Sequence, residues 1–245
     1  TDAECRQYIL RQAFEESLHN LTIVYICDSL DLDIDEVFNA YETIPSIKAK
    51  DDFLMEITTD LSRQDFNSST KQGKQEILRN LLTYYIVCEG TFFFSGFAML
   101  LALGRQNKLQ GVSDQIKYTL RDESSHIAFG TYLINQLIEQ NPTIWTKSIQ
   151  NEFIEHIKKA VDLEISYAKD VLPTGILGLN ANMFVDYMHY IGNRRLEAIG
   201  LDYRFPSDQN PFPWLGEVVD VQAMGNFFER RVREYQQSGS LEEDF

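Results

Sequence analysis

Two short motifs in this sequence place a carboxylate and an imidazole at the same spacing. Glu16 precedes His19 by three residues, and Glu123 precedes His126 by three residues. In an α-helix, residues i and i+3 lie one turn apart on the same face, so one metal ion can contact both side chains of a pair. A third carboxylate, Glu89, stands inside an apolar stretch, where coordination to a cation lowers the cost of burying its charge. Together these residues predict a metal site.

The same spacing has a more ordinary interpretation elsewhere in the chain. A single Glu-x-x-His motif is common by chance in a helical protein, so the prediction depends on two motifs occurring together with Glu89. Asp186 and His189 share the spacing, but no further carboxylate helix remains to complete a second site. We interpret them as a structural or surface pair. For His156, which follows Glu152 by one turn, we predict a solvated helix face.

The elements that must position these residues are helices. Hydrophobic periodicity and scarce Pro and Gly predict helices over seven segments, which are 2–30, 34–43, 46–60, 71–104, 111–139, 143–171 and 180–199. Such long helices favour an elongated bundle. Glu-x-x-His from each of two helices plus a Glu from another nearly matches the dinuclear carboxylate site of ferritin-like bundles. We therefore expect an all-α, ferritin-like long-helix bundle over 1–200.

The C-terminal part differs in composition. Residues 201–225 are rich in Pro and aromatic residues and predict an irregular strap over the bundle. Residues 226–245 predict a short helix followed by a flexible acidic tail that ends in Phe245. An acidic tail with a terminal aromatic residue is typical of a peptide that docks on a partner protein, and a solvated terminus is the alternative.

Composition and charge exclude several classes of protein. The chain has 245 residues, of which 44% are hydrophobic, which is enough for a core. Its 37 acidic and 22 basic residues give a net charge of −15, which would repel a nucleic-acid backbone. The longest apolar stretch, 91–103, is too short to span a membrane, and the N-terminal residues show no signal-peptide pattern. Three widely spaced cysteines indicate a reducing compartment, and we expect a cytoplasmic protein that binds neither nucleic acid nor membranes.

Four segments, in this order, resemble the radical-generating (small, beta) subunit of class I ribonucleotide reductase. They are 11–30 around the first motif, 89–97 beginning at Glu89, the Arg-Asp-Glu-x-x-His motif at 121–126, and 226–236. The last segment resembles a C-terminal signature that other ferritin-like proteins lack. The resemblance extends from residue 1 to the C-terminus.

The resemblance implies a function, a cofactor and partners. In this family a dinuclear metal centre uses O₂ to make a one-electron oxidant, which passes to a separate catalytic (large) subunit that makes deoxyribonucleotides. The subunit is a homodimer and docks on the large subunit through its C-terminal tail. The implied metal ligands are Glu16, His19, Glu89, Glu123 and His126. Carboxylate and imidazole ligands suit iron and manganese. Two other functions stay open, namely a ligand-binding oxidase of the same superfamily and a non-catalytic metal-binding remnant.

The aromatic residues after Glu89 have two interpretations. An aromatic wall would keep water away from a strong oxidant, and plain core packing would place the same residues inside. The wall would consist of Phe92, Phe93, Phe94 and Phe97.

One departure from the family pattern concerns the radical-bearing tyrosine. The family has this tyrosine one turn after the first ligand histidine, where this chain has Ile23, which cannot hold a phenoxyl radical. Tyr25 is rotated by about 200° around the helix and points elsewhere. The sequence is similar to the chlamydial-type subgroup (class Ic), in which a manganese–iron pair stores the oxidising equivalent. We expect an Mn/Fe centre, with Fe/Fe as the alternative and loss of activity as the competing explanation.

The resemblance also implies a radical-transfer route. By motif, Asp122 and Tyr235 lie on this route, and His19 is its start at the metal side. Asp122 is rotated by about 100° from Glu123 around its helix, which suits an outer partner of a ligand. Tyr118 matches a tyrosine that assists electron transfer in the chlamydial type, and an ordinary buried tyrosine is the alternative.

The family pattern contains one more carboxylate ligand, on a helix before that of Glu16, and an interface tryptophan earlier still. Asp2 and Glu4 lie about 21 and 18 Å from Glu16 along the helix axis, so neither can substitute. We expect a fragment, a split product or a short variant, in which one metal lacks a ligand. A separate N-terminal fragment is therefore a further expected partner.

Overall fold

The regular secondary structure in the residues that the structure describes is helical. The computed structural model describes residues 3–175 and 178–215, and this part of the chain contains no β-strand. The elements are α1 (Ala3–Ser29), α2 (Ile34–Phe38), α3 (Ala40–Thr43), α4 (Pro45–Ile57), α5 (Lys71–Leu81), η1 (Leu82–Cys88), α6 (Glu89–Thr91), α7 (Phe94–Arg105), α8 (Gln110–Gln140), η2 (Pro142–Ile144), α9 (Lys147–Val171), α10 (Ala181–Ala198) and η3 (Pro213–Leu215). The predicted all-α class is confirmed.

Polar caps set several of the helix boundaries. The Asp33 carboxylate accepts hydrogen bonds from two backbone N–H groups at the start of α2, and Thr70 and Thr146 cap α5 and α9 through their hydroxyl groups. The helix predicted to begin at residue 143 starts at Lys147, because a 3₁₀ turn at Pro142 precedes the Thr146 cap. The helix predicted over 34–43 is divided at Asn39 into α2 and α3.

The predicted helix over 71–104 is interrupted at the centre of the molecule. Residues 82–88 form a π-helix, and a turn at Phe92 and Phe93 separates α6 from α7. A π-helical turn holds an extra residue and is frequent at functional sites. The carbonyl oxygens exposed by this break accept hydrogen bonds from two basic side chains, Arg195 to Gly90 (2.6 Å) and Lys50 to Phe92 (2.9 Å).

The same stretch is long and apolar enough to be tested as a membrane span. Residues 71–105 pass by length and hydropathy, but 72% of the most apolar window is buried inside the protein. The stretch is therefore the central core helix of the bundle.

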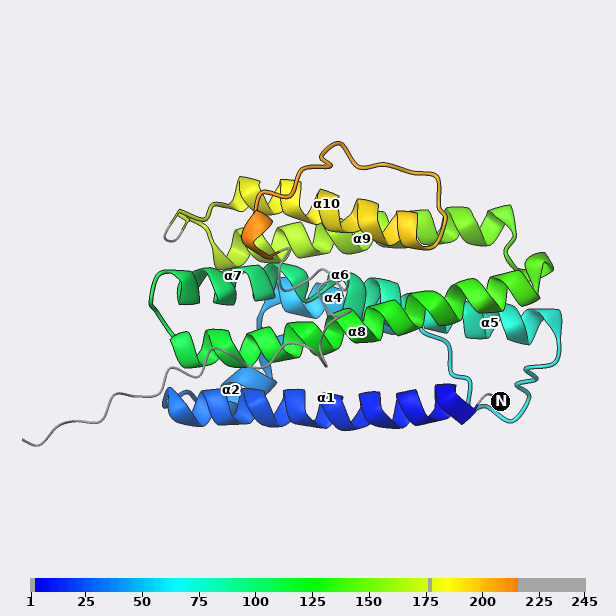
Figure 1. Ribbon diagram of the computed structural model, residues 1–245, viewed down its shortest axis with the longest axis horizontal. Helices are drawn as coiled ribbons and strands as arrows, with labels where there is room; N and C mark the ends of the chain where they lie inside the picture. Colours follow the sequence, from blue (N-terminus) through cyan, green and yellow to red (C-terminus); the bar gives the residue numbers. More distant parts are fainter. Residues whose placement is uncertain (1–2, 176–177, 216–245) are drawn as a thin grey trace, which may run out of the picture.

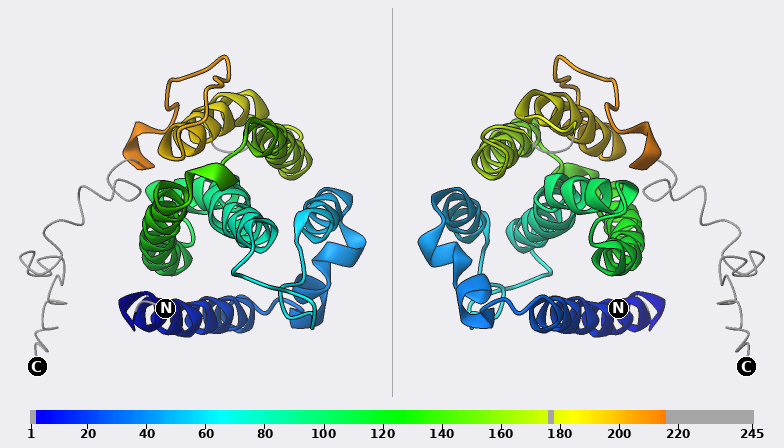
Figure 2. Two further views of the ribbon diagram at one scale, coloured as in Figure 1. Left: turned by 90° about the vertical axis from the view of Figure 1, so that its right-hand side faces the viewer. Right: turned by 90° about the vertical axis from the view of Figure 1, so that its left-hand side faces the viewer.

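The helices lie in layers, as Figures 1 and 2 show. α1 forms one face, α8 and the α5–α7 segment form the middle, and α9 with α10 forms the opposite face (Figure 1). The main hydrophobic core lies between the middle layer and the α9–α10 layer, around Leu82, Phe94, Leu120, Phe153 and Phe184, which are all fully buried. A smaller core around Phe53 joins α4 to α9.

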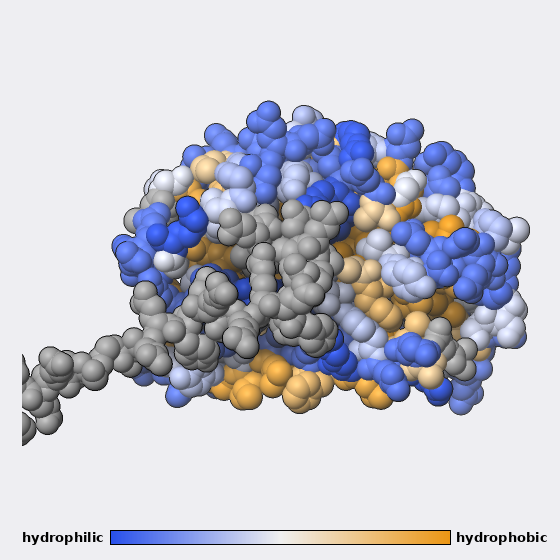
Figure 3. Space-filling view, viewed as in Figure 1, coloured by the Kyte–Doolittle hydropathy of each residue, from blue (hydrophilic) through white to orange (hydrophobic). Residues whose placement is uncertain are grey.

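α1 buries mainly polar side chains and exposes large apolar ones, which is the reverse of an ordinary surface helix. Its buried residues are Gln12, Glu15 and Cys27, whereas large apolar side chains on it are exposed. Figure 3 shows apolar residues along the edge of the molecule where α1 lies. The inner face of this helix is therefore built for polar contacts with the middle layer.

Residues 201–212 form an irregular segment that crosses α10 (Figure 1). Asn193 on α10 anchors it, because its side-chain oxygen accepts from the Phe205 backbone N–H (2.7 Å) and its amide donates to the Ser207 carbonyl (3.1 Å). The predicted strap continues to residue 225, and residues 216–225 lie outside the described residues, as do the predicted short helix and tail over 226–245.

Candidate metal centre

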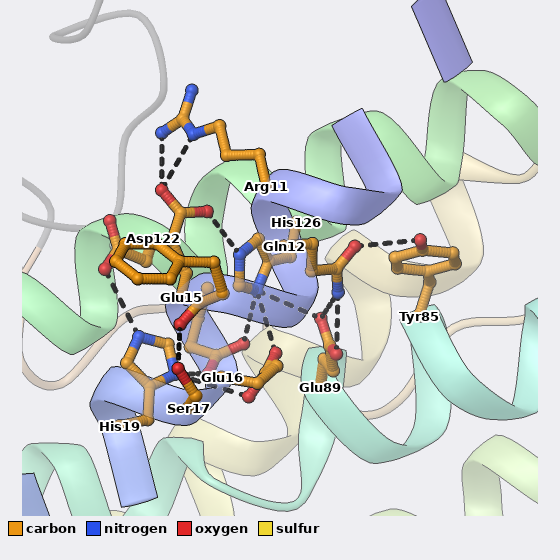
Figure 4. A network of polar contacts seen from close by, with 12 residues as sticks. Arg11, Gln12, Glu15, Glu16, Ser17, His19, Tyr85, Glu89, Asp122 and His126 are labelled. Atoms are coloured by element: carbon orange, nitrogen blue, oxygen red, sulfur yellow. Dashed lines mark hydrogen bonds and ion pairs between the residues drawn. The ribbon is translucent and has the colours of Figure 1, made fainter. Parts of the chain in front are cut away.

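Three segments of the bundle bring all five predicted ligands together. Glu16 and His19 come from α1, and Glu123 and His126 from α8. Glu89 is the first residue after the π-helix, where the middle layer faces α1. Figure 4 shows Glu16, His19, Glu89 and His126 converging between the helices.

The carboxylates of Glu16 and Glu123 each span both histidines. Glu16 places one oxygen 3.4 Å from His19 Nδ1 and the other 3.3 Å from His126 Nδ1. Glu123 does the same at 3.2 Å and 3.4 Å. Glu89 faces only His126, with Oε2 3.5 Å from Nδ1. The cluster therefore has two halves, one at each imidazole, joined by two shared carboxylates.

The unpaired atoms of the cluster fit metal ions. Glu16 Oε1, Glu123 Oε2 and the Nδ1 atoms of both histidines are buried and have no hydrogen-bond partner. The ligand atoms of Glu16, Glu89, Glu123 and His126 all lie within 4.8 Å of one another. Atoms that each lie about 2.1 Å from one ion at right angles are about 3 Å apart, close to the nitrogen–oxygen spacing here. Oxygen and imidazole donors of this kind suit iron and manganese.

The electrostatics of the cluster follow from burial and from mutual contact. Burial alone would raise the pKa of Glu16, but the two imidazoles outweigh it and hold the pKa at about 2. Burial would lower the pKa of His19, but Asp122, Glu123 and Glu16 outweigh it and raise the pKa to about 11. For Glu89 burial prevails, and the pKa is raised. A positive charge between the carboxylates, on an imidazole ring or a metal ion, therefore stabilises their ionised forms.

Each histidine contacts a further carboxylate through its other ring nitrogen. His19 Nε2 lies 3.2 Å from Asp122, the position predicted for that residue. His126 Nε2 lies 3.0 Å from Glu15 Oε2, and Arg11 donates two hydrogen bonds to Glu15 Oε1, at 2.8 and 2.6 Å. Both rings therefore turn Nδ1 towards the cluster and Nε2 towards an outer acceptor, as ligand histidines do.

Glu89 also has an outer partner. The Gln12 side-chain amide donates to both Glu89 oxygens, at 3.0 and 3.2 Å. The Tyr85 hydroxyl donates a hydrogen bond to the Gln12 side-chain oxygen (2.9 Å), and the Gln12 side-chain nitrogen donates a hydrogen bond to the Tyr84 hydroxyl (3.3 Å). These two contacts orient the Gln12 amide. Burial, together with the nearby Glu89 charge, raises the pKa of both tyrosines, so both hydroxyl groups stay protonated.

The sequence reasoning missed Gln12 and Glu15. One signal was available, because residues 12, 15, 16 and 19 are spaced by three or four and share one face of α1. Which ligand each residue meets depends on contacts with α6 and α8, and local spacing does not contain that information.

Other residues singled out in the sequence are exposed or fall outside the described residues. The Tyr118 side chain is 60% exposed on α8, so the alternative of an ordinary buried tyrosine is wrong. Ile23 is 37% and Tyr25 64% exposed. Tyr235 lies outside the described residues.

Two histidines outside the motifs are half-buried and pack against aromatic rings. The prediction of a solvated helix face for His156 is wrong, because its ring packs edge-on between Phe53 and Phe153 and burial lowers its pKa. His189 stacks on Phe205, consistent with the structural interpretation of the Asp186–His189 pair.

The phenylalanines after Glu89 separate into two groups. Phe92, Phe94 and Phe97 are buried, whereas Phe93 is 44% exposed. The turn between α6 and α7 changes the helical register and turns Phe93 outward. The expectation that Phe93 belongs to an aromatic wall is therefore wrong.

A bundle of long helices whose facing side chains form two Glu-x-x-His pairs and a further Glu defines the ferritin-like dinuclear carboxylate class. Residues 1–211 match the family described as ribonucleotide reductase, small chain. The chain is 52% identical, over 98% of its length and 69% of the relative's, to the ribonucleoside-diphosphate reductase subunit beta of Chlamydia pneumoniae. The chain belongs to the ribonucleotide reductase small-chain family.

More distant relatives agree. The chain is 29% identical to the ribonucleoside-diphosphate reductase small chain of Plasmodium falciparum, over 97% of this chain and 62% of the relative. It superposes on the ribonucleotide reductase R2 subunit of Clostridium botulinum with a TM-score of 0.77 and 28% identity, covering 90% of this chain and 68% of the other. A class I ribonucleotide reductase structure from Bacillus halodurans gives a TM-score of 0.78 at 24% identity, over 89% and 76% of the two chains, and supports the fold.

Proposed function

We propose that this chain is the radical-generating small subunit of a ribonucleoside-diphosphate reductase. The observation that carries the proposal is the pair of carboxylates, Glu16 and Glu123, that each span two imidazoles whose buried Nδ1 atoms have no hydrogen-bond partner. Membership of the small-chain family supplies the reaction. A dinuclear metal centre held by these residues would supply O₂ activation and a one-electron oxidant for a separate catalytic subunit that makes deoxyribonucleotides.

The proposed ligands have distinct roles within the site. Glu16 and Glu123 bridge the two halves, His19 serves one half, and His126 with Glu89 serves the other. The test is metal stoichiometry of the whole chain: the parent is expected to bind two ions, and His126→Ala and Glu89→Ala to lose one of them. Glu155→Ala, which changes an exposed carboxylate on α9, is the control.

We propose a mixed manganese–iron centre rather than a di-iron centre. Ile23 cannot store a radical, so the oxidising equivalent must stay on the metals. The 52% identity to the chlamydial relative, over 98% of this chain, supports this assignment. Metal analysis with electron paramagnetic resonance tests it. One manganese and one iron per chain are expected, whereas a tyrosyl doublet or a di-iron centre of full activity would refute the proposal.

We propose that the radical leaves the site through Asp122 and reaches the partner subunit through Tyr235, with Tyr118 assisting electron transfer. Support comes from the contact of Asp122 with His19 Nε2 (3.2 Å). Tyr235→Phe is expected to abolish nucleotide reduction and to leave metal loading intact. Tyr118→Phe should slow formation of the active centre, and Tyr132→Phe, a similarly exposed tyrosine on α8, should not. Equal rates in these two variants would remove Tyr118 from the route.

We propose two protein partners, a large catalytic subunit bound by the acidic tail at 241–245 and a second copy of this chain. The family relation supports both, and the exposed apolar face of α1 supports the homodimer, since large exposed apolar patches mark interfaces. Leu10 and Leu21 on this face are 72% and 61% exposed. Leu10→Glu with Leu21→Glu should halve the mass in sedimentation. A synthetic peptide of 241–245 should compete for the large subunit, and no competition would exclude the tail.

We also propose a cytoplasmic location. Cys5, Cys27 and Cys88 are all free thiols, as expected in a reducing compartment. Fractionation of the source cells tests this proposal directly.

A further inference from the structure

The two ligand histidines differ in the carboxylate that contacts their outer ring nitrogen, Nε2. His19 contacts Asp122, whose side chain is 32% exposed, whereas His126 is fully buried and contacts Glu15, whose side chain is 11% exposed. Glu15 is itself held by the guanidinium of Arg11. We propose that Glu15 is a positioning residue that fixes which nitrogen of His126 faces the metal and strengthens that nitrogen as a ligand. This inference rests on the proposed metal centre.

The geometry shows how Glu15 would act. A neutral imidazole carries one N–H and one lone pair, and the hydrogen bond of one nitrogen decides which form is present. Glu15 Oε2 lies 3.0 Å from Nε2 and accepts a hydrogen bond from the N–H form of that nitrogen. The lone pair then lies on Nδ1, which faces Glu16, Glu89 and Glu123 at 3.3–3.5 Å. A carboxylate acceptor also increases the basicity of the imidazole, so the metal bond becomes stronger.

Arg11 fixes the direction in which Glu15 points. Both of its hydrogen bonds go to Oε1, one turn away on α1, which leaves Oε2 for His126. The side chain of Arg11 is 59% exposed, so its charge is screened more than that of Glu15. Glu15 therefore keeps most of its effect on His126 while Arg11 offsets the cost of its burial. Asp122 is more exposed, so its effect on His19 should be smaller.

Two substitutions of Glu15 distinguish the effect of its hydrogen-bond acceptor from the effect of its volume. Glu15→Gln keeps a carbonyl oxygen that can accept from Nε2–H, and Glu15→Leu has similar volume and no acceptor. Arg11→Gln, a third variant, leaves Glu15 in place and releases its clamp, so the test does not depend on Glu15→Leu folding. Glu155→Leu changes an exposed carboxylate on α9 and serves as the control.

The whole chain is loaded with Zn²⁺ as a diamagnetic probe and studied by NMR of the imidazole groups. The chain has four histidines, so the His126 signal can be assigned by substitution of the others. We expect a slowly exchanging downfield Nε2–H signal for His126 in the parent. This signal should move upfield in Glu15→Gln and Arg11→Gln and disappear in Glu15→Leu, while the His19 signal stays.

Titration with Co²⁺ gives the affinity without O₂ or the partner subunit. Loss of an outer partner of a ligand typically lowers metal affinity 10–100-fold, and we expect a loss of about that size in Glu15→Leu. Glu15→Gln and Arg11→Gln should lose less than Glu15→Leu, and Glu155→Leu should match the parent. A parental Nε2–H signal and affinity in Glu15→Leu, or equal losses in Glu15→Gln and Glu15→Leu, would overturn the inference alone. A parent that binds neither Zn²⁺ nor Co²⁺ would overturn the proposed metal centre together with it.

Discussion

Replacing Gln12 with leucine should destabilise the metal-free protein through two buried groups at once. Gln12 is 4% exposed and donates to both oxygens of Glu89, which lose this donor. The Tyr85 hydroxyl, on a side chain that is 4% exposed, loses its acceptor at the same time. Leucine has a similar volume, so packing changes little.

The magnitude follows from these contacts. A hydrogen bond to a charged group contributes about 1.5–3 kcal/mol, and leaving the buried Tyr85 hydroxyl without a partner costs about 1–3 kcal/mol. Burial of the leucine side chain offsets about 1–2 kcal/mol of this loss. The free energy of unfolding should therefore fall by about 0.5–5 kcal/mol for Gln12→Leu, which corresponds to about 1–20 °C in Tm for a chain of this size.

Urea unfolding of the metal-free parent, Gln12→Leu, Tyr85→Phe and the double variant measures these energies. Tyr85→Phe alone should lose about 0.5–1.5 kcal/mol, and the double variant should be less destabilised than the two single losses combined, because the unsatisfied hydroxyl is gone. Gln72→Leu, which removes an exposed amide that donates to Glu76, is the control and should stay within about 0.5 kcal/mol of the parent. Strictly additive losses, or a loss in Gln12→Leu no larger than that of the control, would refute the reasoning.

Three further predictions concern the surroundings of the site. Lys50→Met leaves the fully buried Glu164 carboxylate without its cation and should lower the free energy of unfolding in urea by about 3–5 kcal/mol. The double variant Lys50→Met with Glu164→Leu should recover much of this loss, and no recovery would contradict a buried ion pair. Gly130→Ala should cost about 1–3 kcal/mol by the same measurement, because a methyl group there would lie 2.0 Å from the Tyr85 ring; a stability equal to the parent would show that the ring moves freely. Burial lowers the pKa of His156, so near neutral pH this histidine binds fewer protons in the folded protein than in the unfolded chain, and the free energy of unfolding should fall as the pH drops below about 6.5. His156→Gln should weaken this fall, as measured by urea unfolding at pH 7.5 and 5.5. An unchanged pH dependence in the variant would contradict the prediction.

Much of the fold and of the site could be predicted from local sequence. Hydrophobic periodicity located the long helices. All five predicted ligands meet in one cluster. They could be recognised in the sequence because the i and i+3 spacing places each Glu-x-x-His pair on one helix face and because Glu89 stands in an apolar stretch. The break within 71–104 was not predicted, because the π-helix and the turn at Phe92 and Phe93 depend on packing against other elements and on basic side chains from α4 and α10.

Glu15 and Gln12, unlike Asp122, could not be predicted as outer partners of the ligands for the same reason. Glu15 is 111 residues from His126, and Gln12 is 77 residues from Glu89. No periodicity links such positions, because the contact exists only after α1 docks on α6 and α8. His156 was assigned to a solvated face, since its neighbour Phe53 comes from a different helix.

The sequence alone determined the types and local spacing of the metal-binding side chains, the helices that carry them, and the family to which they belong. Tertiary structure decided which oxygen of Glu16 and Glu123 faces which histidine, and which acceptor stands behind each ring. The physical reason is range: helix geometry fixes side chains within a turn or two of one another. The docking of separate helices fixes the contacts between them, and those contacts set the electrostatics of a buried charged site.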